Sequence, residues 1–174
     1  MPFQIIPATI DEQPLPDEPA AAYVRRLALA KAETVAQRHP GAVVLGADTI
    51  VTIDALLLGK PQTVGEARQM LNRLNGKRHE VLTGVAVVTV EMTVNARGQR
   101  ASEVVSSRVL MRRFTTTTIE WYVATGEPLD KAGAYAVQGL GAALIERVEG
   151  SYTNVVGLPL AETLALLRRF GIAD

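Results

Sequence analysis

The sequence predicts a single α/β domain over residues 1–174, built on a mixed, twisted sheet. Short apolar runs bounded by turn residues, such as 42–45 and 49–53, are typical of buried strands. They alternate with longer amphipathic segments, of which 19–38 is the clearest, that are typical of helices. A long β-rich hairpin in the middle of the chain excludes an all-parallel sheet, so we expect a mixed one.

Turn and capping residues give the order of the elements in the first half of the chain. Pro19 follows acidic residues and marks the start of a helix. Thr63 and Glu66 have the spacing of a capping box, which marks a second helix. The expected elements are a strand at 3–7, an acidic Pro-rich loop at 11–18, a helix at 19–38, strands at 42–45, 49–53 and 56–58 with a turn at 54–55, and a helix at 63–74.

The second half begins with the hairpin and ends with a helix. Thr117 and Glu120 repeat the capping-box spacing and predict a short helix that ends at Gly126. The expected elements are strands at 81–90 and 104–114 joined around 95–98, the helix from 117, a glycine-rich segment at 131–141, a strand at 143–148 and a helix at 159–170.

Composition excludes several classes of partner and site. Lys plus Arg and Asp plus Glu both number 18, so no global field favours nucleic acid or anionic lipid. The chain has no cysteine and two histidines, which excludes disulfides and Cys-based zinc sites and is consistent with a cytoplasmic protein. The start has no basic leader followed by an apolar core, so we expect no signal peptide. The most apolar stretch, 41–59, carries Asp48 and Asp54, which makes a membrane span implausible.

Lys31 is the most informative residue by geometry alone. It lies in the middle of the apolar stripe that Val24, Leu27, Ala28 and Val35 form on the first helix. A lysine at such a position either extends to the surface, pairs with an acid, or faces a cleft that holds an anion. The pattern leaves these three alternatives open.

Asp48 follows an apolar run directly, at the end of a buried strand where open α/β sheets place their ligands. It is a candidate for a metal ligand or a general base, and equally for a turn cap or a hydrogen-bond partner of Thr49. Lys60, between Gly59 and Pro61, is ambiguous, because exposed lysines are common in turns. The charged cluster at 77–80 is expected to be a solvated entry to a strand.

Several segments together resemble the Maf family of nucleotide pyrophosphatases. They occur in the family's order over nearly the whole chain, which makes the resemblance much more specific than any one of them. The segments are IDE at 10–12, LALAKA at 27–32, GADTIV at 46–51, GKP at 59–61, HEVLTGV at 79–85, TGEPLDKAGAYAVQG at 125–139, SY at 151–152 and VVGLP at 155–159.

This resemblance implies hydrolysis of a nucleoside triphosphate to the monophosphate and pyrophosphate, on a fold similar to that of inosine triphosphate pyrophosphatases with a central cleft. Asp48 matches the family's proton acceptor and a ligand of a divalent cation, Mg²⁺ or Mn²⁺. Lys31 and Lys60 match lysines that face the phosphates. The site residues that the resemblance implies beyond these are Thr49 and Gln138 for base selection, in the version of the subgroup that acts on dTTP and UTP, and Glu12 and Glu127 as acids that bind or support the metal.

The resemblance also implies a Ser- and Arg-rich phosphate-binding loop before the segment that starts here at Phe3, and the sequence contains no such loop. We therefore expect weaker hydrolysis than in relatives that carry it. The alternative functions are a catalytically weak or inactive nucleotide-binding regulator associated with cell division, and a pyrophosphatase for other noncanonical nucleotides. By analogy with the family, the expected assembly is a homodimer, with a role in septum formation.

Overall fold

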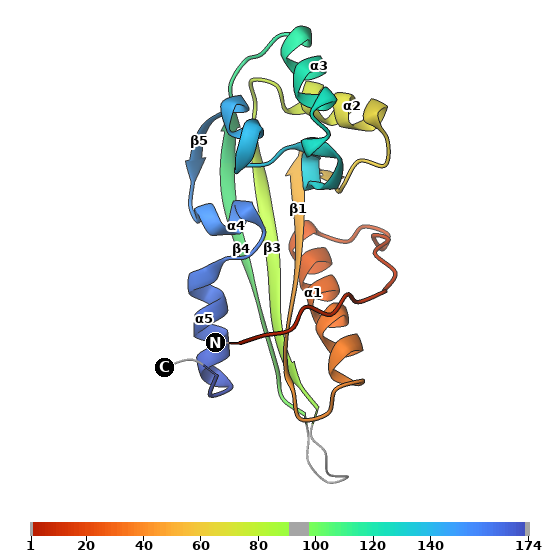
Figure 1. Ribbon diagram of the computed structural model, residues 1–174, viewed down its shortest axis with the longest axis vertical. Coiled ribbons are helices and arrows are strands. Elements are labelled where there is room, and N and C mark those ends of the chain that lie inside the picture. The colour runs from red at the N-terminus through yellow and green to blue at the C-terminus, as the bar shows by residue number, and fades with distance from the viewer. Residues whose placement is uncertain (1, 91–97, 173–174) are drawn as a thin grey trace. The chain divides into compact units, whose positions relative to one another are not determined.

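The structure is a computed structural model that describes residues 2–90 and 98–172 (Figure 1). Its longer helices alternate with strands, and three short 3-10 turns follow α3. The elements in chain order are α1 (Ala20–Ala36), β1 (Val43–Ile53), β2 (Leu56–Leu58), α2 (Val64–Leu74), β3 (Arg78–Thr89), β4 (Arg100–Met111), α3 (Thr116–Ala124), η1 (Glu127–Asp130), η2 (Ala132–Ala134), η3 (Gly139–Leu144), β5 (Ile145–Glu149), α4 (Tyr152–Val156) and α5 (Leu160–Arg169).

The five strands form one sheet in the order β2-β1-β3-β4-β5. β1 pairs antiparallel with β2 after a tight turn at Asp54 and Ala55, whose φ angles are 51° and 63°. β4 pairs antiparallel with β5, and the Gly41 N–H before β1 donates to the Val90 carbonyl after β3, as antiparallel neighbours require. The α/β class is confirmed. The sheet is antiparallel where we expected a mixed one, because α2 carries the chain past β1 and leaves β2 and β3 on opposite sides of it.

Three sequence predictions about elements are corrected. Residues 3–7 form no strand, and Phe3 and Ile5 are 80% and 82% exposed, since this segment has no place in the sheet and buries little. The runs 42–45 and 49–53 join into the single strand β1. The N-cap of α3 is Thr115, whose hydroxyl accepts from the Thr118 N–H. Part of the connection between β3 and β4, residues 91–97, lies outside the described residues.

The chain divides into two compact units, each with its own core. Unit 1 comprises Met1–Asp48, Gly84–Val104 and Leu160–Asp174, and unit 2 comprises Thr49–Thr83 and Val105–Pro159. In unit 1, α1 packs small residues against β3, in a cluster of Ala28, Ala32, Ala36, Ala86 and Val88. In unit 2, α2 and α3 cover the sheet, and the largest buried side chains include Leu71, Leu74, Met111, Ile119 and Tyr122. A single domain over 1–174 stays a prediction.

Glycine allows α1 to approach the strands of unit 1 closely. A Cβ on Gly46 would lie 2.5 Å from the Ala28 carbonyl oxygen, and one on Gly84 would lie 2.3 Å from the Val24 carbonyl oxygen. Any side chain at either position would force the helix outward. Because side chains alternate along a strand, Gly46 and Asp48 share the face of β1 that α1 covers.

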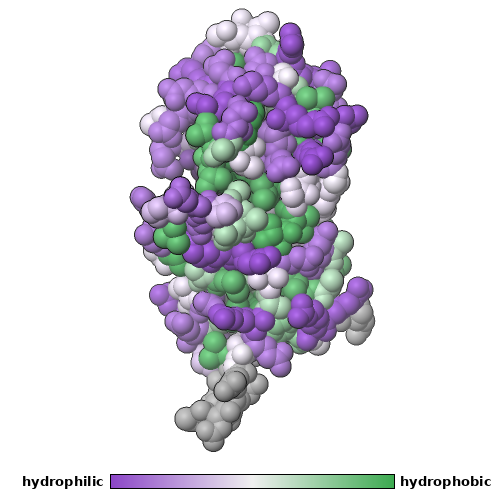
Figure 2. All heavy atoms as spheres, turned by 180° about the vertical axis from the view of Figure 1, so that it is seen from behind, coloured by the Kyte–Doolittle hydropathy of each residue, from purple (hydrophilic) through white to green (hydrophobic). Residues whose placement is uncertain are grey.

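No helix in the described part of the chain is long and apolar enough to cross a membrane. On the face shown in Figure 2, polar side chains predominate and apolar surface forms smaller areas between them.

Candidate active site

Unit 1 brings together three of the residues that the sequence singled out. The Lys31 ammonium lies 2.7 Å from the Asp48 carboxylate and 2.7 Å from the Glu12 carboxylate. The Asp48 side chain is 10% exposed, Lys31 is 23% exposed and Glu12 is 54% exposed. Of the three alternatives for Lys31, the structure therefore shows the one in which the lysine pairs with acids.

The electrostatics of this cluster keep Lys31 charged. Burial disfavours the ammonium, but its hydrogen bonds to Asp48 and Glu12 outweigh burial and raise the pKa of Lys31 above its ordinary value. Two carboxylates thus share one cation at the edge of solvent. Such an arrangement can hold a positive charge next to an anionic ligand, or exchange the lysine for another cation when a ligand binds.

The local fold explains why these three side chains meet. Ala28 and Ala32 pack against Gly46, so Lys31 sits beside the strand at the level of Asp48. Glu12 reaches the same ammonium from the loop before α1, which contains no helix or strand between residues 10 and 15. The helix and strand were visible in the sequence, whereas Glu12 was singled out only by the family resemblance, as an acid that binds or supports the metal.

Thr49 lies in unit 2 and belongs to a buried polar network. Its hydroxyl is 2.9 Å from the Thr83 hydroxyl and 3.4 Å from the Gly157 carbonyl. Thr83 is fully buried and donates to the Asn154 carbonyl at 3.1 Å. Sequence reasoning gave Thr83 and Asn154 no role; a signal for Thr83 was its hydroxyl within the apolar run 81–90, which holds only one other, on Thr89.

Two further predicted site residues of unit 2 are exposed. Lys60 precedes Pro61, and the Gly59 carbonyl accepts from the Gly133 N–H at 3.0 Å, which ties this segment to the glycine-rich one. The hydrogen bond from Lys131 is the main cause that lowers the pKa of Asp130. The positive charges of Lys131 and Lys60 also lower it. Gln138 immediately precedes η3, and its side chain caps no helix.

The Glu127 carboxylate accepts hydrogen bonds from three groups of the protein itself. It accepts from the Tyr122 hydroxyl at 2.8 Å and from the Leu140 and Gly141 N–H groups at 2.9 and 2.8 Å. Burial opposes ionisation, but these three hydrogen bonds outweigh it and lower the pKa of Glu127. A Cβ on Gly139 would lie 2.5 Å from this carboxylate, and the φ of Gly139 is 79°, so any other residue there would displace the carboxylate and strain the backbone. Glu127 holds the turn that begins after Gln138, and its geometry favours that supporting role over metal binding.

His79 corrects the expectation of a solvated cluster at 77–80. Its ring is buried, and Nε2 lies 2.7 Å from the Tyr135 hydroxyl. Burial is the main cause that lowers the pKa of His79 to about 4, so the imidazole is neutral near neutral pH. Alternation along β3 explains the difference, since Arg78 and Glu80 on either side of it point to solvent.

Comparison with known proteins decides the family. The family model described as Maf-like protein matches residues 1–170. The chain belongs to the Maf-like protein family.

The curated relatives of this Maf-like chain are similar to it over nearly its whole length. A protein of Myxococcus xanthus named dTTP/UTP pyrophosphatase is 52% identical over 170 residues, which cover 98% of this chain and 83% of the relative. Proteins of the same name from Symbiobacterium thermophilum and Syntrophus aciditrophicus are 48% and 47% identical, covering 98% and 97% of this chain and 84% and 80% of those relatives.

Proposed function

We propose that this chain is a nucleoside-triphosphate pyrophosphatase that converts dTTP and UTP to the monophosphate and pyrophosphate. The observation that carries the proposal is the Glu12–Lys31–Asp48 cluster, in a chain about half identical to proteins named dTTP/UTP pyrophosphatase. Hydrolysis of a phosphoanhydride needs a base for the water and positive charge for the phosphates, and this cluster supplies both.

Asp48 is the proposed proton acceptor. Its carboxylate is nearly buried and held by Lys31, so its orientation is set before a substrate arrives. In the proposed reaction it takes a proton from the water that attacks phosphorus, and the pyrophosphate leaves. Lys31 and Lys60 are the proposed cationic ligands of the phosphates, where they offset the charge that develops on the phosphoryl oxygens.

A divalent cation is part of this proposal, and the residues fit it. Mg²⁺ is commonly bound through one or two carboxylates together with substrate phosphates, so it needs no complete protein cage. Asp48 and Glu12 offer two carboxylates that already share one cation, although the described residues contain no group of three or more metal-ligating side chains. When bound, the cation would neutralise phosphate charge; Asp48 and Glu12 would hold it.

Thr49 and Gln138 are the proposed determinants of base selection. A glutamine amide offers both an N–H donor and a carbonyl acceptor, which suits the N–H and carbonyl edge shared by uracil and thymine. Gln138 is exposed after a buried run, and the backbone that follows it is held by Glu127, so the amide is presented from a supported turn.

The test is a substrate profile. Pyrophosphate release is measured with Mg²⁺ for dTTP, UTP, CTP, ATP and GTP, and we expect dTTP and UTP to be preferred by about 10²-fold or more, as sites that hydrogen-bond a substrate edge achieve. A flat profile or a preference for purines would exclude the base assignment. Nucleotide binding without pyrophosphate release would instead favour the nucleotide-binding regulator.

Three accompanying parts of the proposal are a cytoplasmic location, a homodimer without nucleic-acid partners, and a role in septum formation. The balanced charge supports the absence of nucleic-acid binding. Sedimentation at several protein concentrations tests the dimer.

A further inference from the structure

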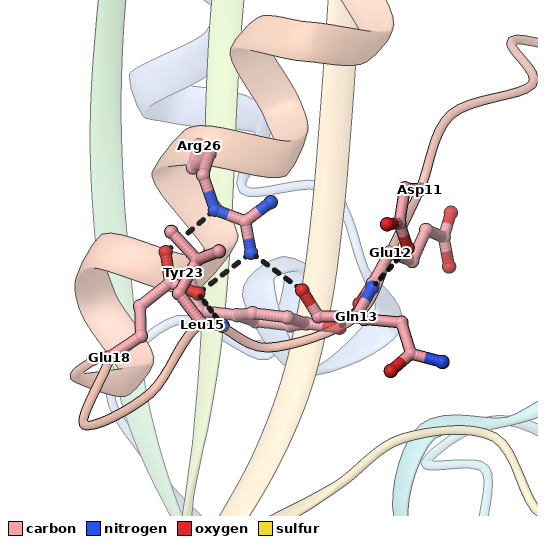
Figure 3. Close-up of polar contacts among 7 residues, drawn as sticks. All are labelled: Asp11, Glu12, Gln13, Leu15, Glu18, Tyr23 and Arg26. Atoms are coloured by element: carbon pink, nitrogen blue, oxygen red, sulfur yellow. Dashed lines mark hydrogen bonds and ion pairs between the residues drawn. The ribbon is translucent and has the colours of Figure 1, made fainter.

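The loop that carries Glu12, residues 11–18, is held by side chains of α1. The Tyr23 hydroxyl donates to the Glu12 carbonyl at 2.9 Å, and Arg26 Nη2 donates to the Gln13 carbonyl at 3.1 Å (Figure 3). Both donors come from the first two turns of the helix. The two bonds hold two consecutive backbone carbonyls, those of Glu12 and Gln13, and neither of them uses the Glu12 carboxylate.

The arginine is itself held in place. Its Nε and Nη2 each lie 2.7 Å from a different oxygen of Glu18, whose side chain is 7% exposed. The hydrogen bond from Arg26 is the main cause that lowers the pKa of Glu18. The second Glu18 oxygen also accepts from the Leu15 N–H at 3.1 Å, and the guanidinium lies 5.6 Å from the centre of the Tyr23 ring. Glu18, Tyr23 and Arg26 are called the clamp below.

The clamp leaves the Glu12 carboxylate pointing outward. In Figure 3 this carboxylate points away from Arg26, and its partner is the Lys31 ammonium at 2.7 Å. Lys31 belongs to the same helix as Tyr23 and Arg26. One helix therefore fixes the backbone of Glu12 near its start and receives the side chain of Glu12 farther along.

We propose that Glu18, Tyr23 and Arg26 are positioning residues for the pyrophosphatase reaction: they hold the 11–18 loop so that Glu12 meets Lys31 and Asp48. The inference rests on the proposed function, because it assigns the clamp a role through Glu12. A loop without helix or strand loses conformational entropy whenever it adopts one conformation. Because the clamp fixes the loop when the protein folds, this entropy is lost on folding and not on substrate binding. Glu12 is therefore in place before the substrate binds.

The first arm of the test is geometric and needs no substrate. A carbodiimide joins a carboxylate to an amine only at ion-pair distance, so the yield of the Glu12–Lys31 cross-link, measured by mass spectrometry, reports this pair. We expect Arg26→Met to lower the yield several-fold, while the Asp48–Lys31 cross-link, which competes for the same amine, does not fall in the same sample. Unchanged Glu12–Lys31 cross-linking in Arg26→Met would overturn the proposal.

The second arm is a kinetic double-mutant cycle with dTTP. Arg26→Met keeps an aliphatic side chain on Tyr23 but removes every donor, and we expect kcat to fall about tenfold, within the 10²-fold that a small misplacement can cost. In a Glu12→Gln background the same substitution should change kcat by less than about twofold, because the clamp then has no carboxylate to position. An equal loss in both backgrounds would show that Arg26 acts independently of Glu12, and would also overturn the proposal.

Arg68→Met is the matched control. Arg68 holds Glu120 with the same two-pronged geometry, at 2.8 Å for both Nε and Nη2, on the surface of unit 2. We expect it to change neither the cross-link nor kcat. If the wild type releases no pyrophosphate from dTTP or UTP, the proposed function fails, and the cross-linking arm still decides whether the clamp positions Glu12.

Discussion

Glu12 and Glu127 are both glutamates of family-like segments, yet the two units of the molecule use them in opposite ways. The Glu12 carboxylate in unit 1 is half exposed and binds a lysine side chain. The Glu127 carboxylate in unit 2 binds two backbone N–H groups and a buried tyrosine hydroxyl. A flexible lysine can move away when a ligand binds, whereas backbone amides cannot leave without unfolding the turn.

This difference separates a carboxylate that can take part in chemistry from one that maintains structure. Chemistry requires an oxygen whose partner can be exchanged for water, phosphate or a cation. Structure requires partners that stay. Asp48 belongs with Glu12 by this criterion, since the cation beside it is also Lys31. Substitutions in unit 1 should therefore change rates, and substitutions at Glu127 should change stability.

The largest effect is expected for Asp48→Asn. The amide keeps the shape of the side chain but has almost no basicity, so pyrophosphate release from dTTP should fall by about 10²–10⁴-fold. Lys31 keeps its pair with Glu12, so the unfolding temperature should change less than in Glu127→Gln. Enzyme assays with Mg²⁺ and thermal unfolding on the same samples measure both quantities.

Asp54→Asn is the control for Asp48→Asn. Asp54 also pairs with a lysine, Lys77 at 3.7 Å, and its φ of 51° suits asparagine equally well. It should leave the rate unchanged. Full activity in Asp48→Asn would remove this residue from the mechanism, and a collapsed unfolding temperature would mean that Asp48 is structural.

Glu12→Gln should have the second largest effect. It removes one of two carboxylates next to Lys31, and loss of an acid that supports a metal or an active-site cation typically costs about 10–10²-fold in activity. The cost should appear in kcat and in the Mg²⁺ concentration needed for half-maximal rate, with little change in unfolding temperature because the side chain is half exposed. A loss of stability without a change in rate would reverse the contrast with Glu127.

The helices and strands of the fold could be predicted well from local signals. Pro19 is the N-cap of α1, Thr63 caps α2 through the Glu66 N–H, and the turn at Asp54 and Ala55 is present. The pairing of strands could not be predicted in the same way. Whether 3–7 joins a sheet depends on a partner strand far away in the chain, and the order of the strands depends on the path of α2 past β1.

For the candidate site, the helical periodicity identified Lys31, and the structure supplied its partners. No spacing rule predicts that Glu12 reaches Lys31, because the loop before α1 that carries Glu12 has no periodic structure and is fixed by Tyr23 and Arg26. The prediction of a solvated His79 is wrong because the charged residues on either side of it conceal the alternation of the strand. For Glu127, only the three hydrogen-bond donors in the structure distinguish a supporting role from a ligand role.

Glu127→Gln should destabilise unit 2 more than it slows the reaction. The amide replaces an acceptor oxygen by an N–H₂ group, so one of the three donors loses its acceptor, which typically costs about 1–3 kcal/mol. The free energy of unfolding should fall by this amount in chemical denaturation, while kcat for dTTP changes by less than about threefold. A large loss of rate at unchanged stability would place Glu127 in the chemistry after all.

The smallest expected effect is the pH dependence of the difference in stability between wild type and Glu127→Gln. The pKa of Glu127 is lowered below its ordinary value of 4.5, so its ionised form stabilises the folded state above that value and this stabilisation is lost as pH falls through the folded pKa. His79 acts in the other window: its pKa falls from 6.5 to about 4, so the folded state loses stability as pH falls from 6.5 towards 4. His79 is present in both wild type and Glu127→Gln, so its contribution to the pH dependence of stability cancels when the two proteins are compared. The gap between their unfolding temperatures should therefore stay constant from neutral pH down to about 5 and narrow only below the ordinary carboxyl pKa. A gap that narrows already between pH 6.5 and 5 would mean that Glu127 and His79 are coupled, and a gap that never narrows would mean that the Glu127 charge contributes nothing to the turn it holds.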